Sequence, residues 1–280
     1  MKTLLIAGVA LAALIGTEAL AADMPLKAPP QPIVTCNWCG FYVGANAGYA
    51  WSHDSMSTAS TPTPDALLGV VPGVTEGIAA LSAGGVPIGH SNGFIGGVQA
   101  GYNWQTGNFL AGIEADIQGL SHTGGSGTIT QTAIVVGSPV TSTQTGTASV
   151  SYLGTLRGRL GIVANQNWLL YVTGGLAYGG VKANDSIVQT STNGFSGADF
   201  GSLSTTRAGW ALGAGTEWMF APKWSVKAEY LHYDLGTASF GSAPVGTPTS
   251  AFFVGTPYQT NVTSVRFQGD MVRLGLNYHL

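Results

Sequence analysis

The sequence predicts an all-β fold: an eight-stranded antiparallel transmembrane β-barrel with short periplasmic turns and four long extracellular loops. The first observation is a strict alternation in Phe41–Trp51, where one parity is apolar with aromatic ends and the other is small or polar. Side chains of a strand point alternately to its two faces. The second is composition, because only 8% of the residues are charged, against about 25% in average soluble domains. The third is that long and short connections alternate along the chain, as they do in such barrels.

Residues 1–21 predict a cleaved secretory signal peptide. Lys2 gives a short positive start, Leu4–Ile15 is an apolar core, and Ala19-Leu20-Ala21 is a small-x-small cleavage site. The core is too short for an ordinary membrane anchor, so the pattern favours a signal peptide over a buried N-terminal helix. We expect cleavage after Ala21 or one residue later.

The mature chain is expected to comprise a Pro-containing periplasmic leader at residues 22–39 and one barrel domain at residues 40–280. Proline removes backbone donors and favours extended conformations. Nothing after the signal peptide runs 18 apolar residues without interruption, so membrane helices are not predicted. A closed barrel is then the remaining structure that satisfies every backbone group in lipid. The net charge of −3, without a basic block, argues against a nucleic-acid partner.

Eight segments carry the alternation and are predicted to be the strands. They are 41–51, 92–105, 108–119, 149–163, 168–180, 207–220, 224–235 and 265–280. The long connections, which are expected outside the cell, are 52–91, 120–148, 181–206 and 236–264. The short connections are Thr106-Gly107, Ala164–Asn167 and Ala221–Lys223. An even number of strands returns both termini to the periplasm.

Aromatic residues gather beside the short connections. They are Trp104, Phe109, Trp168, Trp218, Phe220 and Trp224. Aromatic side chains favour the membrane–water interface, so this end is predicted to carry the periplasmic girdle.

The inward parity of the predicted strands carries the charged residues. They are Glu114, Asp116, Arg157, Arg159, Glu217, Lys227, Glu229 and Arg273. An Arg or Lys that faces lipid near the bilayer centre costs roughly 2–4 kcal/mol, so these eight residues are predicted to form one paired network in the lumen. Neighbouring strands are expected to pair by sign, as in Glu217 with Lys227. The same parity holds many glycines, which leave water-filled space open as an alternative to a lumen filled by side chains.

Four stretches resemble one known family. Cys39–Tyr49 is similar to the opening strand of small alphaproteobacterial outer-membrane proteins, often called outer-membrane immunogenic proteins or porin-family barrels. Gly209–Trp218 is similar to the family's penultimate downward strand, and Val226–Gly236 and Val272–Tyr278 match its last two strands. The resemblance implies an outer-membrane location and insertion by the barrel-assembly machinery. The expected partners are outer-membrane lipid and lipopolysaccharide.

Two positions depart from the family's pattern. The family usually ends in Phe, whereas Leu280 ends this chain and makes the insertion signal atypical. Cys39 stands where the family usually has Thr or Ser, and with Cys36 it forms a C-x-x-C motif. A thioredoxin-like role needs a βαβ context and a helix N-terminus, and neither is visible. In the oxidising periplasm we expect either a local disulfide or two idle thiols.

Four histidines support an alternative function. His53, His90 and His122 lie in predicted outer loops, and His232 lies near the outer end of the seventh strand. Clustered histidines can hold haem or a transition metal, and some members of the resembling family are reported to bind haemin. The spacings match no metal motif, so no metal site and no resident cofactor are predicted.

No catalytic residue is predicted. His232 and Asp234 share a strand face and Ser239 follows them, but no nucleophile motif surrounds the serine. We therefore predict a non-enzymatic integral outer-membrane β-barrel protein that contributes to envelope integrity and surface presentation, with weak porin activity left open. The alternative is a surface receptor for haem or another small ligand, which would bind through the extracellular loops.

Overall fold

The computed structural model describes residues 36–121, 124–246 and 255–280. The predicted signal peptide, residues 22–35 of the predicted leader and His122 lie outside the described residues. Cys36–Leu280 form one compact unit.

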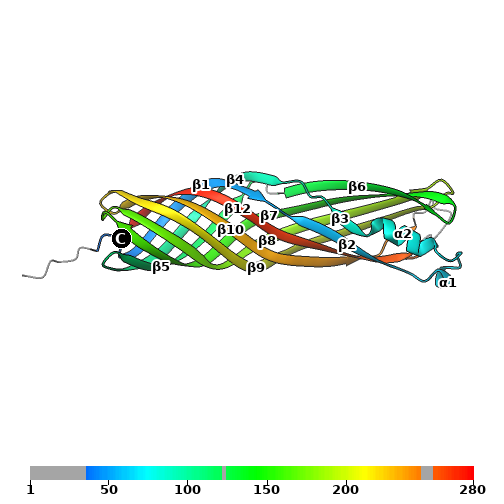
Figure 1. Cartoon of the computed structure of the whole chain (residues 1–280), viewed down its shortest axis with the longest axis horizontal. Helices are drawn as coiled ribbons and strands as arrows, with labels where there is room; N and C mark the ends of the chain where they lie inside the picture. Colours follow the sequence, from blue (N-terminus) through cyan, green and yellow to red (C-terminus); the bar gives the residue numbers. More distant parts are fainter. Residues whose placement is uncertain (1–35, 122–123, 247–254) are drawn as a thin grey trace, which may run out of the picture. The chain divides into compact units, whose positions relative to one another are not determined.

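One antiparallel sheet of twelve strands makes up most of this unit (Figure 1). Eight of its strands neighbour one another in the order β1 (Gly40–Ser52), β4 (Ser91–Thr106), β5 (Phe109–Leu120), β7 (Ser138–Ala164), β8 (Trp168–Ser191), β9 (Ser196–Ala221), β10 (Trp224–Ser242) and β12 (Gln259–His279). β12 pairs with β10 and also with β1, from Tyr42↔His279 to Ser52↔Gly269. This last ladder closes the path, so the sheet is a barrel.

The sheet contains more strands than the eight that the alternation predicts. The additional strands are β2 (Ser55–Pro62), β3 (Gly84–Val86), β6 (Gly124–Val135) and β11 (Val245–Gly246). All four lie in segments that were predicted to be long loops. β6, for example, pairs with the first part of β7 through facing threonines, such as Thr130 with Thr143. Threonine is β-branched and favours strands, but a Thr-, Ser- and Gly-rich stretch has no apolar parity from which a strand can be predicted.

The short connections are tight turns at the end where the C-terminus lies (Figure 1). Gly107 has a φ of 60°, and Asn165 and Gln166 have φ of 54° and 53°. Gly107 begins the two-residue turn between β4 and β5, where a glycine with positive φ at the first position matches the twist of the flanking strands. Asn165 and Gln166 lie in the three-residue turn between β7 and β8. The opposite end carries α1 (Asp65–Leu68) and α2 (Val74–Ser82).

The Asp65 carboxylate fixes the start of α2. It accepts hydrogen bonds from the backbone N–H groups of Gly73 (2.6 Å) and Thr75 (2.9 Å). Ile78 of α2 is buried in a cluster with Val135, Val140, Phe195 and Tyr258, so α2 packs onto the sheet at the end away from the tight turns. In the described part of the chain, no helix is both long and apolar enough to cross a membrane.

The outward face of the barrel is apolar over a band bounded by aromatic residues. Large exposed residues of this band are Phe41, Val43, Val98, Ile113, Leu156, Leu160, Val172, Leu212 and Leu274. At the turn end Trp168 stacks on Trp218 at 5.9 Å between ring centroids. Tyr49 and Phe94 meet at the other edge, at 5.5 Å. An apolar belt between two aromatic girdles is the surface expected of a barrel in a bilayer.

Candidate functional site

The lumen brings together the charged residues of the inward parity. Glu114 and Asp116 come from β5, Arg157 and Arg159 from β7, Glu217 from β9, Lys227 and Glu229 from β10, and Arg273 from β12. Strand alternation points all of them inward. Every one of these side chains is 0% exposed, so the network is shielded from solvent.

Arg157 occupies the middle of the network. Its Nη2 lies 2.6 Å from Glu114 Oε1 and 2.8 Å from Asp116 Oδ2, while its Nη1 donates to Glu229 at 3.1 Å. Glu114 stands directly opposite Arg157 across the β5–β7 ladder, whereas Glu229 comes from β10. The guanidinium therefore joins neighbouring and non-neighbouring strands.

Arg273 of β12 binds two of the same acids, Glu229 and Asp116. Its Nε donates to Glu229 Oε1 at 2.8 Å and its Nη2 donates to Asp116 Oδ2 at 2.8 Å. Nη1 donates to the Gln118 side chain at 3.2 Å. Four acids and four bases balance within the lumen, and charge-assisted hydrogen bonds of this length are the stronger kind.

The predicted ion pair between Glu217 and Lys227 is wrong. Glu217 and Lys227 are opposite each other in the β9–β10 ladder, but Lys227 Nζ donates to both carboxylate oxygens of Glu114, at 2.8 and 2.9 Å. Glu217 instead accepts from Arg159 Nη2 at 2.7 Å. The lumen is narrow enough for side chains to meet across it, so proximity within a ladder does not decide the partners.

Two tyrosines complete the network, and the sequence reasoning missed both. The Tyr42 hydroxyl donates to Glu114 Oε2 at 2.7 Å and accepts from Arg159 Nη1 at 2.5 Å. The Tyr171 hydroxyl donates to Glu229 Oε2 at 2.8 Å, and the Arg159 guanidinium lies 4.1 Å from the Tyr171 ring centroid. Their inward parity, shared with the charges, was the signal that could have identified them.

The inward glycines make room for these large side chains. A Cβ built on Gly101 would lie 2.4 Å from the Tyr42 ring, and one on Gly215 would lie 2.6 Å from the Tyr171 hydroxyl. A Cβ on Gly44 would lie 2.1 Å from Asn277 Oδ1. At these positions, the space that the sequence left open for water is filled by neighbouring side chains.

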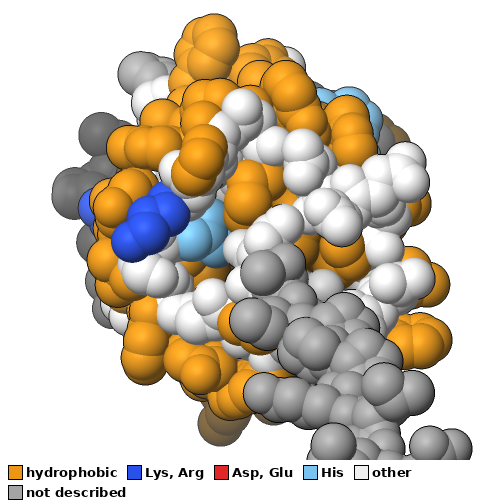
Figure 2. All heavy atoms as spheres, turned by 90° about the vertical axis from the view of Figure 1, so that its left-hand side faces the viewer, with side chains coloured by type: hydrophobic (Ala, Val, Ile, Leu, Met, Phe, Trp, Pro, Cys, Tyr) orange, Lys and Arg blue, Asp and Glu red, His pale blue; other side chains and the backbone are white. Residues whose placement is uncertain are grey.

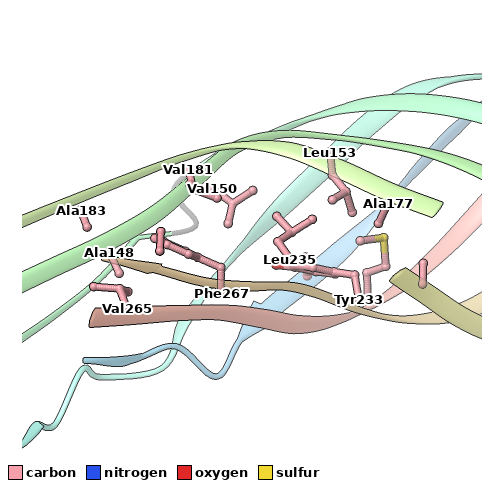
Figure 3. Packing of buried hydrophobic residues seen from close by; sticks show 14 of the residues in the cluster. Ala148, Val150, Leu153, Ala177, Val181, Ala183, Tyr233, Leu235, Val265 and Phe267 are labelled. Carbon is pink, nitrogen blue, oxygen red and sulfur yellow. The ribbon is translucent and has the colours of Figure 1, made fainter. Parts of the chain in front are cut away.

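Apolar side chains fill the lumen on both sides of the charged network. On the side away from the tight turns, buried residues of nine strands form one cluster, and Figure 3 shows Leu153, Tyr233, Leu235 and Phe267 within it. Towards the turn end, a second cluster consists of Trp38, Leu110, Val163, Leu169, Tyr171 and Met219. The charges are therefore enclosed between two apolar layers.

The remaining candidate residues fall into two groups. Cys36 and Cys39 form a disulfide with Cα atoms 5.5 Å apart. His53 and His90 are neighbours, with ring centroids 5.1 Å apart, and the Nδ1 atoms of His53 and His232 lie 3.4 and 2.8 Å from the Asp270 carboxylate. Three of the four candidate histidines thus converge, and His122 lies outside the described residues.

Neither a metal site nor a triad is assembled from these groups. Within 36–121, 124–246 and 255–280, no group of three or more His, Cys, Asp or Glu residues could hold a metal ion. His232 bonds to Asp270, while Asp234 pairs with Arg266 at 2.5 Å. Ser239 bonds to Ser264, so the polar groups that a hydrolytic triad would need are engaged elsewhere.

A closed sheet that is apolar outside and holds its charges inside defines a membrane β-barrel protein. The family described as outer membrane protein beta-barrel domain matches residues 7–279, and the chain belongs to this family. Its place is therefore the outer membrane.

Two relatives agree with this assignment. The 31 kDa outer-membrane immunogenic protein of Brucella melitensis is 37% identical over 245 residues, which cover 84% of this chain and 88% of that protein. The 22 kDa outer membrane protein of Rhizobium leguminosarum is 30% identical over 158 residues, which cover 54% of this chain and 60% of that protein. The names of both describe outer-membrane proteins.

Among solved structures, OprG from Pseudomonas aeruginosa has a TM-score of 0.36 and 12% identity, with 86% of this chain and 97% of that chain covered. Neisserial surface protein A has a TM-score of 0.32 and 11% identity, with 86% and 97% covered. Likeness at this level supports no conclusion about activity.

Proposed function

We propose that the chain is a non-enzymatic structural barrel that strengthens the outer membrane and presents an ordered surface outside the cell. The eight strands that close the ring cross the bilayer, and their tight turns lie in the periplasm. The outer parts of β7, β8 and β9, together with β2, β6 and α2, form the presented surface. The position of the exposed apolar band, next to the tight turns, supports this orientation.

The filled lumen is the observation on which the structural role rests. A porin needs a water-filled path, whereas here the buried charges are paired among themselves and enclosed by apolar side chains. Groups tied across the lumen hold strands that are not neighbours in the sheet, so they stiffen the barrel. This favours envelope integrity over weak porin activity.

The partners follow from the same surfaces. We propose that outer-membrane lipid contacts the apolar band, that lipopolysaccharide surrounds its outer edge, and that the barrel-assembly machinery inserts the chain despite the final Leu280. Leu280 is exposed, and its backbone N–H donates to the Phe41 carbonyl at 2.9 Å, so the last residue belongs to the closing β1–β12 edge.

A deletion strain tests the structural role. We expect loss of the gene to increase detergent sensitivity and uptake of a bulky dye, and the wild-type gene to restore both. Uptake of a small hydrophilic solute should not fall in the deletion strain. A fall in that uptake with unchanged detergent sensitivity would contradict the structural role and favour a porin.

A second candidate is a surface receptor for haem or another small ligand. The observation that favours it is the convergence of His53, His90 and His232 around Asp270. A haem titration of the wild type and of the variant with all three residues changed to Gln separates the two functions. Saturable binding that the triple variant loses supports the receptor, and equal spectra of the two proteins at every concentration contradict it.

A further inference from the structure

The segment Cys36–Cys39 closes a small disulfide ring that directs one side chain into the barrel. Cys36 and Asn37 are exposed, whereas Trp38 between the two cysteines is 0% exposed. A tryptophan is large and rarely fully buried. Its burial in a segment that precedes β1 therefore means that the barrel supplies a site for it.

Trp38 connects the start of the barrel to distant strands. Its Nε1 donates to the Gln166 carbonyl, in the β7–β8 turn, at 2.9 Å. It belongs to one buried apolar cluster with Leu110 of β5 and Met219 of β9. These contacts extend across the periplasmic mouth, so the Trp38 side chain blocks that end of the lumen.

The same residue lies at the seam where the first and last strands meet. Trp38 contacts the His279 ring of β12 edge-on, at 5.6 Å between centroids. His279 also packs against Tyr42 of β1 at 5.6 Å, and its Nε2 lies 2.9 Å from the Ser225 hydroxyl of β10. Release of Trp38 would thus loosen the packing on the closing β1–β12 ladder.

The disulfide is accessible to a partner, because Cys36 is exposed. A pocket of about 520 Å³ lies beside it, lined by Cys36 and Cys39 and also by Lys223, His279 and Leu280. Figure 2 looks onto this end, where a basic side chain and a histidine are visible near uncharged polar groups. A nearby cation favours the thiolate form of cysteine, which is both the attacking and the leaving group in thiol–disulfide exchange.

We propose that the Cys36–Cys39 disulfide is a thiol–disulfide exchange site that clasps Trp38 in the periplasmic mouth, and that its substrate class is a dithiol reductant. A thiolate of the reductant attacks the exposed Cys36 sulfur, the Cys36–Cys39 bond breaks, and Cys39 leaves as a thiolate. The second thiol of the reductant then attacks the mixed disulfide and releases Cys36. Two electrons pass to the protein, and the reductant becomes a disulfide.

Reduction opens the ring but leaves the barrel closed. The ion pairs of the charged network and the other apolar cluster contain none of the residues Cys36–Cys39. The expected change is therefore local: Trp38 leaves its site, while the strands remain paired.

The test uses refolded wild-type protein in lipid vesicles, with dithiothreitol as the dithiol. Thiol alkylation and mass spectrometry report reduction, and hydroxyl-radical labelling reports exposure of Trp38. We expect both cysteines to be reduced in the folded barrel and labelling of Trp38 to rise several-fold. The Cys36→Ser, Cys39→Ser double variant should show the raised labelling without reductant and no response to it.

Two results would overturn the proposal. If the cysteines become reducible only after unfolding, the disulfide is not an exchange site. If they are reduced while Trp38 labelling stays at the oxidised level, the disulfide does not clasp Trp38. Both results come from the wild type, so the test stands even if the double variant fails to fold.

Discussion

Replacement of Arg273 by Ala tests whether the lumen network stabilises the barrel. The guanidinium contacts Glu229 and Asp116 at 2.8 Å each and Gln118 at 3.2 Å, and its side chain is 0% exposed. The change removes one of four buried bases and leaves the four acids with an uncompensated negative charge. Breaking a buried pair in this way typically costs about 3–5 kcal/mol.

The assay is a reversible urea titration of protein folded in lipid vesicles, which gives the free energy of unfolding. Arg266→Ala is the matched control, because Arg266 also pairs with a carboxylate, Asp234, but its side chain is 53% exposed. We expect Arg273→Ala to lower the free energy of unfolding by several kcal/mol and the control to lower it far less. Similar small losses of unfolding free energy for the two variants would refute the claim that the network is paired and shielded from water.

Three further substitutions test the outer face, the filled lumen and the effect of pH. Val172→Arg places a charge on the exposed apolar band and should cost roughly 2–4 kcal/mol in the same titration, whereas Val172→Leu should be nearly neutral; equal losses would mean that Val172 does not face lipid. Gly101→Ala should cost about 1–3 kcal/mol by overpacking, because its Cβ would meet the Tyr42 ring at 2.4 Å, while Gly96→Ala has its nearest neighbour at 3.8 Å and should cost little; a harmless Gly101→Ala would argue for free space. Burial raises the pKa of Asp54 from 3.8 to about 6, so its protonated form favours folding below pH 3.8 and this stabilisation is lost as the pH rises through 6. Asp54→Asn should therefore raise the free energy of unfolding at pH 8 by up to about 3 kcal/mol and leave it unchanged below pH 4; a gain that does not depend on pH would contradict this assignment.

Strand alternation was the part of the fold that local sequence could predict. Val172 and Leu274 are exposed and Arg273, between Val272 and Leu274, is buried, because a period of two fixes which face each side chain takes. The tight turn at Gly107 was predictable for a similar reason, since glycine adopts the positive φ that such a turn requires.

Features that depend on non-local pairing could not be predicted. β6 and the first part of β7 have no continuous apolar parity, and their threonine ladder forms only when the two segments meet. Lys227 donates to Glu114 across the lumen and not to Glu217, its neighbour in the β9–β10 ladder. A rule for neighbouring strands cannot anticipate this pair. The glycines were ambiguous for the same reason, because the side chains that fill the space beside them come from other strands.

The conductance of refolded wild-type protein in a planar lipid bilayer tests the central claim, that the lumen is closed, most directly. A channel-forming porin inserted into the same bilayer is the control for detection. The filled lumen predicts that protein insertion produces no stable single-channel steps. Reproducible steps whose ion selectivity changes in Arg273→Ala would contradict it, because ions would then pass the charged network.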